Sequence, residues 1–319
     1  MLIKQLSCDF GQYWRVVGWV LLWGCMMMPP VFAAPRLTIQ DSLVIPAQTV
    51  NGVKLSELSG LAWDQDEQLL YAISDKGRLF HLRLQLRGNR LEAATPIYAV
   101  NLTDVAGDQV KKGRRDAEGL TVMNANNGKR GDTQLVISLE GEPRLIRFTP
   151  QGQAIKNITL PEALRQWRAY RSPNRSLESV TFHPRYGFLT APELPLRAQS
   201  NNMHTVYAMS GKRWSFPVYP EAKSGISAME ALPDGNLLVM ERAWSGMLSP
   251  LVVSLRYVDL QHCSPLGVCP VTDLRVISSH LFIDNYEGLT HIKGNQYLMV
   301  SDDGDESLLN TTLTLFTLD

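Results

Sequence analysis

The sequence predicts an all-β fold, a β-propeller of four-stranded blades with five repeats visible and a sixth possible. Similar segments recur every 52–60 residues along the chain, and a period of this size indicates a repeat architecture. Within each repeat, short apolar runs are separated by turn residues, and helical periodicity is scarce. The period is longer than that of common propeller repeats, so we expect long loops.

Each repeat carries two marker positions. The first is an acidic or polar residue followed by a small residue and an apolar one, at Ser59, Glu118, Glu178, Glu230 and Glu287. The second is a carboxylate that closes an apolar run, at Asp75, Glu140, Glu193, Glu241 and Asp302. In a propeller the first strand of each blade lines the central channel. Because the markers start first strands and end second strands, we expect these acids to meet at one mouth of that channel.

The last repeat ends at Asp319 after only three apolar runs. We expect the N-terminal run 37–45 to supply its fourth strand, which would close the ring and remove exposed edges. The stretch 245–285 is where a degenerate sixth blade would fit. One helix is expected over 161–170, as an insertion between blades, with Leu164 and Trp167 on one face.

The bulk composition fits a soluble globular protein with a large core. The chain has 319 residues, 45% of them hydrophobic, and a formal net charge of zero. Such a balance gives no electrostatic footprint for nucleic acid, and the one basic cluster, at 111–115, is typical of a solvated loop.

Residues 1–33 have the features of a signal peptide, which leaves 34–319 as the mature domain. Lys4 and Arg15 precede an uncharged stretch, and small residues suit cleavage after Ala33. A retained membrane anchor and a lipoprotein cleaved before Cys25 remain alternatives. We expect a periplasmic or secreted protein.

The mature chain keeps two cysteines, Cys263 and Cys269, in a loop that contains Pro and Gly. Two cysteines so placed can form a small disulfide in an oxidising compartment. A zinc site is not expected, because only His262 lies beside them.

A ring of carboxylates implies chemistry. Like charges a few ångströms apart repel by roughly 1–4 kcal/mol per pair, and protonation, arginine pairing or a bound cation relieves this repulsion. Oxygen ligands favour Ca²⁺, so we expect a calcium ion with its ligands among Asp75, Glu118, Glu178, Glu230 and Glu287. Alternatively, these Glu residues accept backbone N–H groups where blades begin and cross-link neighbouring blades.

Three arginines lie near the markers, at Arg115, Arg175 and Arg242. Guanidinium groups bind phosphate bidentately, so these residues are candidates for substrate binding, with solvated loop positions as the alternative. The candidate catalytic residues, including the general base, are Glu140, Glu193, Glu241 and Asp302. The sequence has no nucleophile-elbow motif, zinc-helix motif or phosphate-binding glycine-rich loop.

The order of the motifs resembles a known family. The segments 115–120 with 135–140, 228–242, and 286–289 with 300–303 are similar to the phytase-like domain, also described as esterase-like activity of phytase. The resemblance extends over about residues 40–319. It implies an exported β-propeller that hydrolyses ester or phosphoester bonds. It is more distantly similar to calcium-dependent propeller phytases, whose acidic channel holds Ca²⁺ and phosphate. Ser59 departs from the pattern, because the other first markers are Glu.

Our leading hypothesis is therefore a metal-dependent hydrolase that acts as a monomer on a small phosphoester or ester. We expect neither nucleic acid nor, after signal cleavage, a membrane as a partner. A non-catalytic propeller that binds a ligand or protein and a lactonase-like metal propeller are the alternatives.

Overall fold

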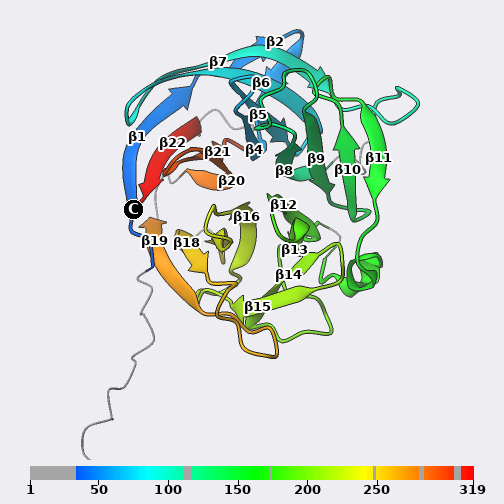
Figure 1. Cartoon of the computed structure of the whole chain (residues 1–319), viewed down its shortest axis with the longest axis vertical. Helices are drawn as coiled ribbons and strands as arrows, with labels where there is room; N and C mark the ends of the chain where they lie inside the picture. The colour runs from blue at the N-terminus through cyan, green and yellow to red at the C-terminus, as the bar shows by residue number, and fades with distance from the viewer. Residues whose placement is uncertain (1–33, 111–115, 173, 247–248, 280–283, 305–309) are drawn as a thin grey trace, which may run out of the picture. The chain divides into compact units, whose positions relative to one another are not determined.

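The computed structural model describes residues 34–319 except 111–115, 173, 247–248, 280–283 and 305–309. Five four-stranded antiparallel blades stand around a common axis (Figure 1). This arrangement confirms the predicted propeller. The predicted signal peptide lies outside the described residues. None of the helices in the described part of the chain has the length and hydropathy of a membrane span.

The strands of each blade follow one another from the axis outward. Blade one holds β4 (Leu58–Asp64), β5 (Leu69–Ser74), β6 (Arg78–Arg87) and β7 (Arg90–Asn101). Blade two holds β8 (Ala117–Met123), β9 (Gln134–Leu139), β10 (Arg144–Phe148) and β11 (Ala154–Ile158). Blade three holds β12 (Leu177–His183), β13 (Gly187–Pro192), β14 (Met203–Ala208) and β15 (Arg213–Pro217).

Blade four holds β16 (Gly225–Ala231), β17 (Leu237–Ala243), β18 (Leu251–Val258) and β19 (Val271–Ser279). Blade five holds β20 (Asn285–Lys293), β21 (Gln296–Asp302), β22 (Thr311–Leu318) and β1 (Leu37–Ile45). A small hairpin of β2 (Gln48–Val50) and β3 (Val53–Leu55) leads from β1 into blade one.

The N-terminal strand closes the ring as predicted. β1 pairs antiparallel with β22 from Leu37 opposite Leu318 to Ile45 opposite Thr311. The described residues of the stretch 245–285 form no sixth blade, since they supply β18 and β19 of blade four. The predicted disulfide between Cys263 and Cys269 is present.

The helix expected over 161–170 is wrong. The segment forms two single 3₁₀ turns, η1 (Glu162–Leu164) and η2 (Trp167–Ala169), because Gln166 between them is extended. Both Leu164 and Tyr170 are buried, and the Tyr170 hydroxyl donates to the Leu164 carbonyl at 2.9 Å. Packing of these two side chains on the core overrides the helical pattern.

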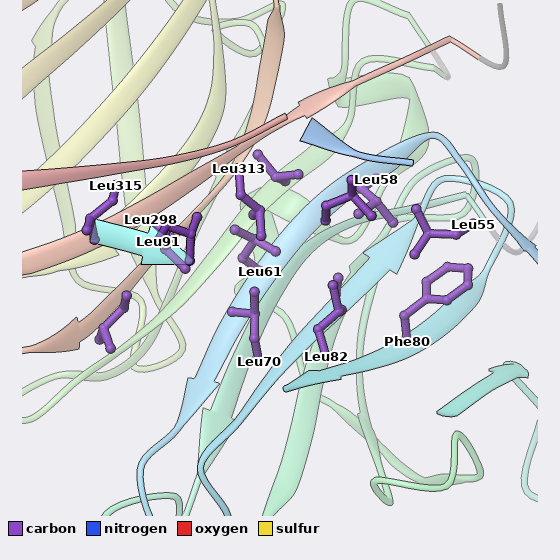
Figure 2. Close-up of a cluster of buried hydrophobic side chains, with 14 of the residues drawn as sticks. Leu55, Leu58, Leu61, Leu70, Phe80, Leu82, Leu91, Leu298, Leu313 and Leu315 are labelled. Carbon is purple, nitrogen blue, oxygen red and sulfur yellow. The ribbon is translucent and has the colours of Figure 1, made fainter. Parts of the chain in front are cut away.

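The core lies between neighbouring blades. Figure 2 shows the cluster between blades one and five, where Leu61, Leu70 and Phe80 of blade one belong to the same buried cluster as Leu298 and Leu313 of blade five. Burial of apolar side chains on both faces of each inner strand explains why these runs read as nearly continuous hydrophobic sequence.

Small residues close the axis of the propeller. A Cβ atom at Gly60 would lie 2.7 Å from the Glu118 carbonyl oxygen, and one at Gly119 would lie 2.6 Å from the Val180 nitrogen. The cavity that remains at the axis measures about 10 Å³, at the lower limit for a single water molecule. The small residues at Gly60 and Gly119 are therefore packing requirements, and the space left at the axis is too narrow for a small molecule to pass.

Candidate functional site

In four of the five blades the first marker coincides with a shift in the pairing of the first two strands. The shifts lie between Leu58 and Gly60, Ala117 and Leu120, Leu177 and Ser179, Ile226 and Ala228, and Tyr286 and Gly288. Such a bulge leaves a residue unpaired and re-aims its side chain. The residues at the shifts include Ser59, Glu118, Glu178, Ser227 and Glu287.

Glu230 is not among these residues, so its predicted place in the ring is wrong. In blade four the shift falls at Ser227, and Glu230 lies three residues further along β16. There its carboxyl group accepts hydrogen bonds from the His291 backbone and the Thr181 side chain and lines a pocket at the opposite end of the axis. The sequence was misleading because Glu230 also precedes a small and an apolar residue.

The second marker of blade four is also displaced by one residue. In each blade, one residue of the second strand pairs with the first strand just before the shift. In blades one, two, three and five the residue that follows it in the sequence is Asp75, Glu140, Glu193 and Asp302, respectively. In blade four Ile226 pairs with Glu241, so the equivalent position is Arg242. Adjacent residues of a strand face opposite ways, and Glu241 therefore does not join the ring.

Glu241 is instead fully buried, with partners in blades three and four. Its carboxylate accepts hydrogen bonds from His204 Nε2 at 3.1 Å, the Tyr219 backbone nitrogen at 2.8 Å and Arg256 at 2.6 Å. Burial alone would raise the pKa of Glu241, but His204 and Arg256 lower this pKa to about 2. These donors fix the loop that leads into β16, which is a structural task.

The other predicted acids do meet at one end of the axis, which we call the acidic mouth. Its eight carboxyl groups act on one another electrostatically and belong to Asp75, Asp116, Glu118, Glu140, Glu178, Glu193, Glu287 and Asp302. Asp116 was missed by the sequence analysis, although it lies only two residues before a marker.

Several carboxyl groups of the acidic mouth have raised pKa values. Burial raises the pKa of Glu118 and of Glu178 well above the usual range, and neighbouring carboxylates raise both further. Burial raises the pKa of Glu140 to about 8, and burial together with Glu287 raises that of Asp302 to about 7. The mouth thus holds more negative charge than its surroundings stabilise, and protons or a cation must compensate for it.

Three basic side chains reach the acidic mouth. Arg242 bonds Glu287 and donates to Asn285 Oδ1 at 3.0 Å. Burial would lower the pKa of Arg242, but Glu287 and other carboxylates raise it, so the guanidinium stays charged.

The other two basic groups are more exposed. Arg175 lies 3.3 Å from Glu193, and Lys76 lies 3.1 Å from Asp75. Their side chains are 40% and 41% exposed, respectively. Lys76 was missed by the sequence analysis, although it directly follows a marker, and Arg115 lies outside the described residues.

One acid of the mouth also cross-links neighbouring blades, which was the alternative role expected for the Glu residues. Glu140, at the end of β9 in blade two, accepts the backbone N–H of Ser176, just before β12 of blade three. Glu140 therefore cross-links neighbouring blades while facing the mouth.

Three carboxylates are close enough to share a cation. Asp116, Glu118 and Glu140 each offer an oxygen, and these oxygens all lie within 4.8 Å of one another. Calcium binds oxygens at 2.3–2.6 Å, so two ligands on opposite sides of the ion are about 5 Å apart. Both the spacing and the all-oxygen donor set fit Ca²⁺.

Comparison with known proteins adds the following findings. The family model of phytase-like proteins, "Esterase-like activity of phytase", matches residues 53–305. No curated protein sequence matches the chain. Among solved structures, the PQQ-bound aldose sugar dehydrogenase from Streptomyces coelicolor is similar, with a TM-score of 0.45 and 11% identity, over 90% of this chain and 100% of that one.

Proposed function

The chain belongs to the phytase-like family, and on that premise we propose that it is a metal-dependent hydrolase of phosphoester bonds. One observation carries the proposal. Blade two supplies Asp116, Glu118 and Glu140, whereas blade four has Arg242 at the position equivalent to Glu140. A cation on one side of the mouth and a guanidinium on the other suit a phosphate group.

Asp116, Glu118 and Glu140 would hold the metal, which we propose is Ca²⁺. The ion supplies positive charge that polarises a phosphoryl oxygen. The chain contributes a set of carboxylates that is already assembled around that place, with Glu140 fixed by the Ser176 N–H. Glu178 lies beside them and adds negative charge that favours a divalent ion.

Arg242, with Arg175 and Lys76, would bind the phosphate of the substrate. The guanidinium fork of Arg242 is oriented by Glu287 and Asn285, so little side-chain freedom is lost when it binds an oxyanion. Arg175 and Lys76 are partly exposed and can turn toward a second phosphate or a neighbouring hydroxyl group.

Asp302 is our candidate for the general base. Its oxygens accept the Gly304 N–H at 2.8 Å and the Asn285 amide at 3.4 Å, which orient the carboxyl group. With a pKa of about 7 it can take a proton from an attacking water near neutral pH. Glu193 is less suited, because Arg175 pairs with it.

We also propose that the protein is exported and acts as a monomer, with residues 1–33 as its signal peptide. The disulfide between Cys263 and Cys269 supports an oxidising compartment.

The test is an assay of metal-stripped protein with and without added Ca²⁺. The substrates are p-nitrophenyl phosphate, inositol hexakisphosphate, p-nitrophenyl acetate and a lactone. We expect Ca²⁺-dependent phosphate release that Glu140→Gln abolishes and that Glu92→Gln, on outer strand β7, leaves unchanged. Turnover of the acetate or the lactone alone would overturn the phosphoester proposal in favour of an esterase or a lactonase. Ligand capture without turnover would favour a binding propeller.

A further inference from the structure

The end of the axis opposite the acidic mouth holds a pocket of about 790 Å³, within the range of small-molecule sites. It is lined by the outgoing ends of β4, β8, β12 and β20 and by Glu230 of β16, so all five blades contribute. The closed axis, with its cavity of about 10 Å³, separates this pocket from the acidic mouth. The pocket is therefore independent of the site described above.

Glu230 supplies the carboxyl group of this pocket. The Thr181 hydroxyl oxygen accepts the Ala231 N–H at 3.0 Å, so its proton is available to Glu230. The His291 backbone N–H is the second donor. Among the described residues, no basic side chain forms an ion pair with Glu230. Burial raises the pKa of Glu230 to about 8, as expected for a carboxyl group that lacks a cationic partner.

Aromatic rings line the same pocket. Trp63 lies next to the end of β4, and its indole N–H donates to Gln65 Oε1 at 3.0 Å, which holds the ring in place. Phe182, near the end of β12, is 42% exposed, although large apolar side chains of this fold are otherwise mostly buried. Aromatic faces attract cations electrostatically.

Two amide side chains at the pocket donate hydrogen bonds within the protein. Asn124 donates to the Asp132 carbonyl at 3.2 Å, and Asn127 donates to the Asp132 side chain at 3.0 Å. Lys293 also lines the pocket, but it is exposed and its ammonium group can stay in solvent.

We propose that this pocket binds a small organic ammonium compound. The ammonium group pairs with Glu230, and its apolar part packs on Trp63 and Phe182. A charge-assisted hydrogen bond to a partly buried carboxylate and contact with aromatic faces are the two interactions that these residues offer together.

The test uses benzylammonium and its neutral analogue benzyl alcohol in calorimetric titrations of the whole protein. Excess Ca²⁺ is present throughout, so that the acidic mouth does not attract the organic cation. We expect benzylammonium to bind at least about tenfold more tightly than benzyl alcohol, because a charge pair with Glu230 forms only with the amine. Glu230→Gln should abolish this preference. Glutamine retains an acceptor for His291 and Thr181, and circular dichroism confirms folding.

Two further variants make the result decisive. Glu140→Gln, at the acidic mouth, should leave benzylammonium binding unchanged. Phe182→Ser, which removes an exposed ring, should weaken it about two- to fivefold. The proposal is overturned if the native protein binds neither probe, if the amine is not preferred, or if Phe182→Ser has no effect. It is equally overturned if Glu140→Gln rather than Glu230→Gln removes the preference.

Discussion

Blades two and four place different chemistry on the same backbone. At the strand-pairing shift, blade two has Glu118 and blade four has Ser227. At the end of the second strand, blade two has Glu140 and blade four has Arg242. The fold thus provides equivalent positions around the axis, and the side chain at each position decides whether that side of the mouth is negative or positive.

Because of this difference, the acidic mouth carries negative charge on the side of blade two and positive charge on the side of blade four. The carboxylates of blade two form a group that fits a cation, whereas Arg242 reaches from blade four toward Glu287 and the carboxylates around it. A uniform ring of acids would repel a phosphate ester. A ring that combines guanidinium groups with a cation site can hold it.

Glu241→Gln should have the largest effect of the proposed variants. It tests whether the hydrogen bonds of Glu241 stabilise blade four without contributing to the acidic mouth. Glu241 is fully buried and bonds Arg256 and His204, so loss of its charge should cost about 3–5 kcal/mol in the free energy of unfolding. Chemical denaturation measures this cost. Calcium affinity measured below the unfolding transition should remain close to that of the native protein. An unchanged free energy of unfolding would show that the network is not structural.

Glu118→Gln tests the negative side of the comparison. Substitution of a direct ligand should lower metal-dependent turnover by at least about a hundredfold, because even indirect supports of a metal site contribute ten- to a hundredfold. Steady-state rates at saturating Ca²⁺, with Glu92→Gln as the control, measure the change. Turnover within a factor of about three of the native value would exclude Glu118 as a ligand.

Arg242→Gln tests the positive side. Hydrogen bonds to charged groups contribute roughly 1.5–3 kcal/mol, so kcat/KM for a phosphate monoester should fall about 10- to 100-fold. Hydrolysis of p-nitrophenyl acetate, if present, should change far less, since that substrate carries no phosphate. Equal losses for both substrates would mean that Arg242 supports the site as a whole and does not read the phosphate.

The pH dependence of stability should show the smallest effect. Glu140 and Asp302 have pKa values raised from 4.5 to about 8 and from 3.8 to about 7. Each therefore binds more protons in the folded state between those values, and the free energy of unfolding should fall as pH rises through that window. Thermal unfolding of metal-stripped protein from pH 4 to 8 measures this fall.

Added Ca²⁺ should reduce the pH effect, because the ion stabilises the ionised carboxylates. Glu241, with a pKa of about 2, contributes in the opposite sense, and its stabilisation is lost only at pH values below about 4.5. A metal-stripped protein whose stability rises from pH 5 to 8 would contradict the charge crowding described for the acidic mouth.

The sequence was sufficient to predict most of the fold. The repeat period, the alternating apolar runs and the incomplete last unit predicted the blades and the closing strand at 37–45, because these features follow from burial patterns. The helix at 161–170 was wrong, since tertiary packing of Leu164 and Tyr170 decided the local conformation.

The site was predictable where the spacing of the blade was regular. Glu118, Glu178 and Glu287 were placed correctly because their motifs coincide with the strand-pairing shift. In blade four a similar motif occurs three residues late at Glu230, and a one-residue slip exchanged Glu241 for Arg242. Because side chains alternate between the two faces of a strand, a one-residue slip moves a side chain to the opposite face. A motif comparison does not detect this change.

Calorimetric titration of metal-stripped protein with Ca²⁺ tests the central claim most directly, with Glu140→Gln and Arg242→Gln as matched variants. We predict stoichiometric binding to the native protein, loss of binding in Glu140→Gln, and equal or tighter binding in Arg242→Gln, because the latter removes a competing positive charge. Absence of binding to the native protein, or unchanged binding to Glu140→Gln, would contradict the assignment of a cation site to blade two.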